Sequence, residues 1–165
     1  MIQKKVCMLG GFAVGKTSLV SRYVRSIFSE KYLTTVGVKI DKKELSLGSR
    51  DLTLMLWDIY GQDAFQSVQQ SYLRGMAGYL LVVDGTRPDT LDAACELQKL
   101  AVAEVGDVPF VLVLNKSDLM ADWQVQDKAL FKLAQDGWSI VRASAKTGDG
   151  VEAVFELLAR KMLPE

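Results

Sequence analysis

A glycine-rich segment that ends in a lysine and a threonine is the clearest chemical signal in the sequence. Residues 10–17 read GGFAVGKT and match the phosphate-binding pattern GxxxxGK[ST], between a predicted strand and a predicted helix. Glycines let backbone N–H groups face phosphate oxygens, Lys16 supplies a positive charge, and the Thr17 hydroxyl can ligate Mg²⁺. An ordinary glycine-rich turn is the alternative, but chance rarely places this pattern between a strand and a helix. The phosphate-binding residues that we expect are Ala13, Val14, Gly15, Lys16, Thr17 and Ser18.

A second polar cluster, Asn115-Lys116-Ser117-Asp118, follows the apolar run 110–114. Open α/β sheets bind their ligands at this carboxyl end of the strands. The Asp118 carboxylate can accept two parallel hydrogen bonds from the ring N–H and the exocyclic amine of guanine, whereas adenine presents no such pair, and the stem of Lys116 can lie over the base. The alternative is an asparagine turn with an aspartate helix cap. Together with the phosphate loop, the cluster predicts guanine-nucleotide binding.

The composition excludes several other kinds of chemistry. The chain contains no histidine, which removes imidazole-based zinc sites and the Ser-His-Asp triad. Its 20 basic and 20 acidic residues cancel, so no overall positive field favours nucleic acid or an anionic membrane. No apolar run reaches the roughly 18 residues of a membrane span, and residues 1–5 lack signal-peptide features. We therefore expect a cytoplasmic protein that binds no nucleic acid and has two reduced cysteines, Cys7 and Cys95.

Short apolar runs alternate with helical patterns along the chain, which is typical of an α/β fold with a mostly parallel sheet. Three runs are continuous, as expected for central strands that helices cover on both faces, and they lie at 6–9, 79–83 and 110–114. Apolar residues at helical spacing predict covering helices within 19–27, 91–101 and 151–162. Weaker helical patterns lie near 66–74 and 125–135.

One pair of predicted strands differs from the rest. Residues 38–47 and 52–57 are joined by Gly48-Ser49-Arg50, which leaves no room for a crossover helix and predicts an antiparallel pair. Within the first strand the apolar positions change parity between Ile40 and Leu45. A period-2 strand does this through a bulge or bend, which we expect near residues 42–44.

With these motifs in place, the chain resembles a Ras-superfamily small GTPase, most closely of the Rab family, over nearly its whole length. Four more segments carry the resemblance: Ser144-Ala145-Lys146, Thr34–Val38, Trp57–Asp63 and Ser71–Gly75. The resemblance implies a P-loop NTPase fold with a six-stranded, mostly parallel sheet that contains one antiparallel strand, surrounded by about five helices. Residues 1–165 would form a single G domain that binds GTP or GDP with Mg²⁺ and hydrolyses GTP.

The resemblance also implies roles for individual residues. Ser144, Ala145 and Lys146 would contact the base, with the Ala145 N–H donating to the guanine carbonyl oxygen. Phe28 would place an aromatic edge against the base, although it could simply anchor a loop. The Mg²⁺ ligands would be Thr17, Thr35 and Asp58, the last through water.

The resemblance implies that Thr35 and the backbone N–H of Gly61 contact the γ-phosphate. Gln62 would be the catalytic residue that orients the attacking water. A solvated side chain is the alternative for Gln62, but its spacing from Asp58 is the one that the motif requires.

The family's partners would be effectors, an exchange factor and a GTPase-activating protein. Ile40, Trp57 and Tyr72 fall where Rab proteins present an apolar cluster to effectors. Trp57 and Tyr72 could instead be plain core residues. Residues 161–165 include no cysteine, so we expect no intrinsic lipid anchor.

Two departures from the family bear on turnover. Phe12 replaces a small phosphate-loop residue, and its ring would occupy space that Gln62 or an arginine finger needs, unless it folds back onto the surface. Ile59-Tyr60 puts bulky side chains into the second switch. We therefore expect slow hydrolysis, with a nucleotide-locked scaffold of negligible turnover as the alternative. A phosphate-loop kinase would leave residues 115–118 without a purpose.

Overall fold

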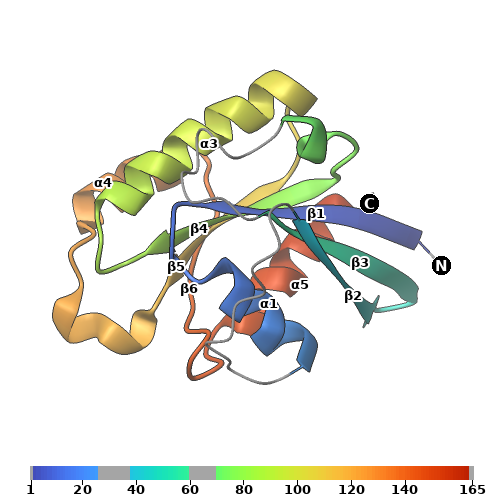
Figure 1. The fold of residues 1–165 in the computed structure, drawn as a ribbon, viewed down its shortest axis with the longest axis horizontal. Coiled ribbons are helices and arrows are strands. Elements are labelled where there is room, and N and C mark those ends of the chain that lie inside the picture. Colours follow the sequence, from blue (N-terminus) through green and yellow to red (C-terminus); the bar gives the residue numbers. More distant parts are fainter. Residues whose placement is uncertain (1, 26–37, 60–69, 164–165) are drawn as a thin grey trace.

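A six-stranded sheet forms the centre of the computed structural model, which describes residues 2–25, 38–59 and 70–163 (Figure 1). The strands are β1 (Ile2–Gly10), β2 (Val38–Leu47), β3 (Arg50–Ile59), β4 (Gly78–Asp84), β5 (Phe110–Asn115) and β6 (Ile140–Arg142). The described helices are α1 (Lys16–Arg25), α3 (Asp89–Val105), α4 (Asp127–Gln135), α5 (Val151–Met162) and the short 3-10 helices η1 (Gln70–Leu73) and η2 (Ser117–Asp122).

The strand order is β2-β3-β1-β4-β5-β6, with β2 antiparallel to β3 and every other neighbouring pair parallel. This confirms the α/β fold with a mostly parallel sheet and one antiparallel strand. Because the parallel strands run the same way, their carboxyl ends share one edge of the sheet. The segments that follow β1, β4, β5 and β6 are therefore neighbours in space.

Helices cover both faces of the sheet. Helices α1 and α5 pack on one face, where the rings of Tyr23 and Phe155 stack with centroids 4.0 Å apart (Figure 1). Helix α3 packs on the other face, where Leu97 and Ala101 are fully buried. Every residue of β4 is buried, which explains why this strand reads as a continuous apolar run.

The prediction of a bulge near residues 42–44 is wrong. The pairing of β2 with β3 is unbroken along the whole strand. The apolar positions change parity because the two halves of β2 are covered on opposite faces: Val38 packs with the α3 core, whereas Leu45 and Leu47 pack with the α1 and α5 core. An edge strand can therefore alternate regularly while its apolar side chains move from one face to the other.

The two weaker helical patterns have different outcomes. The pattern near 125–135 is confirmed as α4. Of the pattern near 66–74, the structure describes the 3-10 helix η1, and residues 66–69 lie outside the described part. Within the described ranges, no helix is both long and apolar enough to cross a membrane.

The two cysteines are free thiols. Cys7 lies in the core, where burial raises the pKa of its thiol to about 12. Cys95 is half-buried, and the pKa of its thiol is also raised by burial. Both thiols therefore stay protonated at neutral pH, in agreement with the prediction of reduced residues.

Candidate functional site

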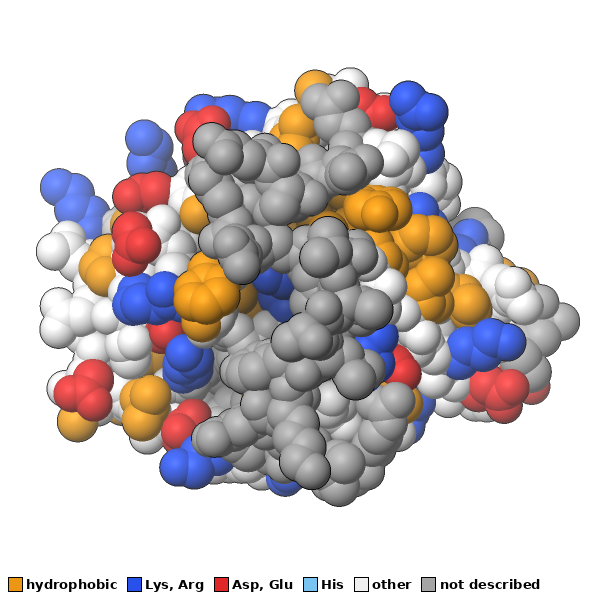
Figure 2. All heavy atoms as spheres, in the orientation of Figure 1, with side chains coloured by type: hydrophobic (Ala, Val, Ile, Leu, Met, Phe, Trp, Pro, Cys, Tyr) orange, Lys and Arg blue, Asp and Glu red, His pale blue; other side chains and the backbone are white. Residues whose placement is uncertain are grey.

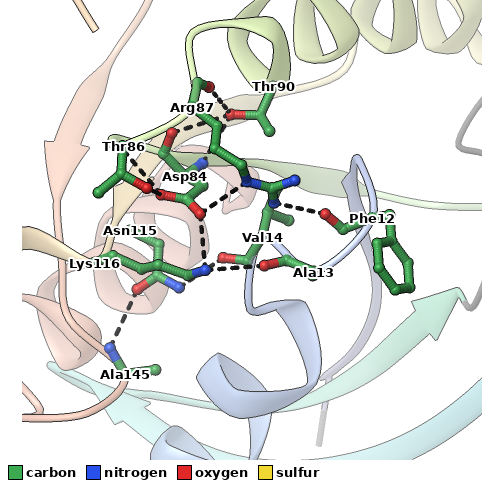
Figure 3. Close-up of polar contacts among 10 residues, drawn as sticks. All are labelled: Phe12, Ala13, Val14, Asp84, Thr86, Arg87, Thr90, Asn115, Lys116 and Ala145. Carbon is green, nitrogen blue, oxygen red and sulfur yellow. Dashed lines mark hydrogen bonds and ion pairs between the residues drawn. The ribbon is translucent and has the colours of Figure 1, made fainter. Parts of the chain in front are cut away.

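The segments that the motifs singled out meet at the carboxyl edge of the sheet. The phosphate loop connects β1 to α1, Asn115 ends β5, and residues 143–146 follow β6 (Figure 3). The ammonium of Lys116 lies between the phosphate loop and Asp84, which ends β4. The topology of parallel strands thus brings together residues that are 101 and 103 positions apart in the sequence.

The phosphate loop has a backbone that requires small residues. Ala13 and Gly15 have left-handed φ values of 59° and 103°. A side chain on Gly15 would overlap the amide nitrogen Nδ2 of Asn115, and one on Gly10 would lie 2.6 Å from the Val82 carbonyl oxygen. Close approach therefore dictates both glycines, and backbone conformation also dictates Gly15.

Three successive carbonyl oxygens of the loop accept hydrogen bonds from side chains outside it (Figure 3). The acceptors and donors are Phe12 with Arg87 Nη2 (2.6 Å), Ala13 with Lys116 Nζ (3.1 Å) and Val14 with Asn115 Nδ2 (2.8 Å). In a planar trans peptide the carbonyl oxygen and the following N–H point in opposite directions. The N–H groups of the next three residues are thus turned the other way, an arrangement suited to anionic oxygens.

Lys16 extends from the start of α1 back over the loop. Its ammonium donates to the carbonyl oxygens of Gly10 at 3.2 Å and Gly11 at 3.5 Å. Burial lowers the pKa of Lys16, and the nearby Asp58 carboxylate partly offsets that effect. A half-buried cation that contacts mainly carbonyl oxygens gains energy when an anion approaches.

Thr17 and Asp58 form a cluster of oxygen ligands. The Thr17 hydroxyl donates to Asp58 Oδ2. Asp58 is 0% exposed, and its Oδ1 has no hydrogen-bond partner among the described residues. Burial raises the pKa of Asp58, while the Thr17 hydrogen bond and the Lys16 charge act against that rise. A hydroxyl beside a carboxylate with one orphaned oxygen suits Mg²⁺, which prefers oxygen ligands.

Asn115 ties the two halves of the site together. Its Nδ2 donates to the Val14 carbonyl oxygen at 2.8 Å, and its Oδ1 accepts from the Ala145 N–H at 3.2 Å. The residue is 2% exposed, so both hydrogen bonds are shielded from water. The asparagine therefore fixes the distance between the phosphate loop and the loop after β6.

Asp118 is oriented by Ser144. The buried Ser144 hydroxyl donates to Asp118 Oδ1 at 2.6 Å and accepts from the Thr147 N–H at 3.1 Å. Asp118 itself is exposed at the start of η2. Its carboxylate is thus held in one orientation while remaining open to a ligand.

Asp84 is a site residue that the sequence analysis missed. Its carboxylate accepts from the Thr86 N–H and hydroxyl, from Arg87 Nε and from Lys116 Nζ. Burial opposes ionisation, but these hydrogen bonds outweigh it and lower the pKa of Asp84 to about 2. Its position at the end of a continuous apolar run, like that of Asn115, could have revealed it. The contact between Arg87 and Asp84 depends on the conformation of the turn after β4. A pattern of residue types does not predict that conformation.

Several expected site residues lie outside the described part of the chain. They are Phe28, Thr35, Gly61 and Gln62. Their roles, including the catalytic role of Gln62, stay predictions. Of the remaining expected contacts, Ser18 is buried near the start of α1 and Lys146 is exposed beside Ala145. The Ala145 N–H, which was expected to donate to the guanine carbonyl oxygen, donates to Asn115 Oδ1 in this structure.

The expected effector cluster lies where β2 and β3 pair. Ile40 is exposed and faces Trp57 in the register, and Trp57 and Tyr72 are half-buried against the α3 core. The ammonium of Lys5 lies 3.7 Å from the centre of the Trp57 ring. Figure 2 shows hydrophobic side chains gathered on this β1 and β3 side of the molecule. The cluster is thus a margin of the core that is partly open to solvent.

Sequence comparisons with known proteins give one consistent set of relatives. The family model described as "Ras family" matches residues 5–164. The chain is 34% identical to Rab-4A of Homo sapiens over 161 residues, which cover 96% of this chain and 74% of that protein. It is 31% identical to Rab-1 of Theileria annulata, covering 96% and 73%, and 33% identical to Rab-7a of Paramecium octaurelia, covering 94% and 79%.

Proposed function

Because the chain belongs to the Ras family of small GTPases and is most similar to Rab proteins, we propose that it is a guanine-nucleotide switch. In this proposal, one G domain over residues 1–165 binds GTP or GDP with Mg²⁺ and hydrolyses GTP slowly. It acts in the cytoplasm and presents its switch surface to an effector protein. An exchange factor and a GTPase-activating protein would control its state.

The pair of bonds made by Asn115 is the observation that carries the proposal. One side chain contacts both the phosphate loop and the segment expected to meet the base, at 2.8 Å and 3.2 Å. A structural asparagine turn would need neither contact. Two subsites joined in this way suit a ligand with a phosphate tail at one end and a purine at the other.

Different residues would bind the phosphates, the base and the Mg²⁺ ion. Lys16 and the loop N–H groups would hold the β- and γ-phosphates, and Asp118, held by Ser144, would accept hydrogen bonds from guanine. Thr17 and Asp58, with Thr35, would hold Mg²⁺. When bound, this ion would neutralise charge on the phosphate oxygens.

Hydrolysis would depend on the two switch segments. Gln62 would orient the attacking water, and Thr35 and the Gly61 N–H would contact the γ-phosphate. Departure of that phosphate would remove both contacts and release the segments. Ile40, Trp57 and Tyr72 adjoin these segments and would carry the change to an effector.

Slow hydrolysis is tested at Phe12. The residue is 63% exposed, and its ring points away from the cluster of Asp84, Lys116 and Asn115 (Figure 3). We expect Phe12→Gly to raise single-turnover GTP hydrolysis about tenfold, because removing the ring frees space for Gln62.

The matched control for this prediction is Phe131→Ala on α4, which removes another exposed phenyl ring, 65% accessible, away from the site. Its hydrolysis rate should equal that of the wild type. Equal rates for Phe12→Gly and wild type would contradict the steric argument. Phosphate release that stays undetectable in both proteins, with or without partner proteins, would instead support the nucleotide-locked scaffold.

The proposed function is tested by extracting the nucleotide that co-purifies with the protein. The account predicts GDP or GTP at close to one molecule per chain, with Mg²⁺ needed to retain it. The ratio of GDP to GTP would report turnover inside the cell. Recovery of adenine nucleotides in place of guanine nucleotides would contradict the proposal.

A further inference from the structure

Arg87 lies in the turn between β4 and α3, outside the segments that the proposed function uses. Its Nε donates to Asp84 Oδ2 at 3.1 Å, and its Nη2 donates to the carbonyl oxygen of Phe12 at 2.6 Å. Arg87 thus links the end of β4 to the phosphate loop, which lies 75 positions earlier in the sequence (Figure 3).

The acceptor at the other end of this link is held firmly. Asp84 is 2% exposed, and its Oδ1 accepts from the Thr86 N–H at 2.9 Å and from the Thr86 hydroxyl at 2.6 Å. Its Oδ2 also accepts from Lys116 at 2.7 Å. Turning this carboxylate away would leave a buried charge unpaired. The planar guanidinium of Arg87, fixed on Asp84, therefore determines where the Phe12 carbonyl is held.

The Arg87 contact orients the peptide between Phe12 and Ala13. A guanidinium on the Phe12 carbonyl turns the Ala13 N–H to the opposite side, because the trans peptide is planar. Ala13 has a φ of 59°, a left-handed conformation that residues with a side chain rarely adopt. Lys116 donates to the next carbonyl, that of Ala13, at 3.1 Å and also to the same Asp84 carboxylate. Two cations on one buried anion thus support this unusual backbone.

We propose that Arg87 is a positioning residue that holds the phosphate loop in its binding conformation and slows the release of bound nucleotide. The inference rests on the proposed function, since it presumes that the Ala13 N–H faces a phosphate oxygen. Arg87 acts through the Phe12–Ala13 peptide. Among the described residues, Ser144 holds Asp118 and Asn115 holds Ala145, and neither of these hydrogen bonds involves Arg87.

The test measures the release of a fluorescent GDP analogue from wild type, Arg87→Ala and Arg87→Lys. We expect release from Arg87→Ala to be about tenfold faster, the effect of losing one charge-assisted hydrogen bond. Arg87→Lys should give a smaller increase, because an ammonium keeps the charge but lacks the planar fork that spans both acceptors. The control is Arg160→Ala, whose arginine pairs with Glu156 on the exposed face of α5 and should leave release unchanged.

Two further readouts separate positioning from general loosening of the fold. The preference for GDP over ADP should be the same in all variants, and the Ala13 amide signal in ¹H–¹⁵N spectra should shift in Arg87→Ala. Unchanged nucleotide release from both Arg87 variants would overturn the inference. Faster release accompanied by a loss of the preference for GDP over ADP would overturn it as well. A wild-type protein that binds no guanine nucleotide would instead contradict the proposed function.

Discussion

Replacing Gly15 with alanine should weaken guanine-nucleotide binding at least about 100-fold. The new methyl group would overlap Asn115 Nδ2, and the φ of 103° is costly for any residue with a side chain. Displacing Asn115 breaks two buried hydrogen bonds, to Val14 and from Ala145. Each partner left unpaired costs about 1–3 kcal/mol, so the two together cost about 2–6 kcal/mol, a range that includes the roughly 2.7 kcal/mol of a 100-fold effect.

The measurement is a titration of each variant with a fluorescent GDP analogue. Gly48→Ala is the matched control, because Gly48 also has a positive φ, 62°, but no atom lies within 4 Å of an added methyl group. Gly48→Ala therefore introduces backbone strain without steric overlap, in the hairpin turn between β2 and β3. We expect Gly48→Ala to bind like the wild type while unfolding at a slightly lower urea concentration. Equal affinities for Gly15→Ala and Gly48→Ala would show that the contact with Asn115 is unimportant.

Replacing Asp118 with asparagine should weaken GTP binding about 1000-fold and improve the binding of xanthosine triphosphate. The carboxylate accepts two hydrogen bonds from guanine in our proposal, whereas the asparagine amide would turn one donor toward the exocyclic amine of guanine. Two charge-assisted hydrogen bonds are worth about 3–6 kcal/mol together, which brackets the expected loss. Xanthine has a carbonyl oxygen in place of that amine and can accept from the new donor.

Displacement of a bound fluorescent nucleotide by each triphosphate measures both effects. Asp122→Asn is the control, since Asp122 is an exposed carboxylate at the other end of η2. Its preference among purines should match that of the wild type. If Asp118→Asn keeps the wild-type order of affinities, Asp118 does not contact the base.

The core and the site differ in how far the sequence predicts them. The central strands are identifiable because residues 6–10 of β1, all of β4 and residues 111–115 of β5 are buried, so burial alone dictates their composition. The edge strand β2 is harder, since each of its halves is covered on a different face and the pattern looks broken. Sequence periodicity reports burial, and it cannot tell which neighbour causes the burial.

The site shows the same division. Lys16, Asn115 and Asp118 follow from strand ends and from the donor and acceptor groups that a nucleotide needs. Asp84 also ends an apolar strand and could have been found in the same way. Arg87 escapes such reasoning because its contacts arise only when the turn after β4 folds against the phosphate loop. Long-range contacts of this kind depend on backbone orientation, which residue types do not specify.

Competition between GTP and ATP for the wild-type protein tests the central claim most directly. Each triphosphate is titrated, with Mg²⁺, against the protein loaded with a fluorescent GDP analogue. The account predicts that GTP displaces the analogue at a concentration at least about 1000-fold lower than ATP does, because only guanine satisfies the carboxylate held by Ser144. Displacement by GTP and ATP at similar concentrations would contradict it.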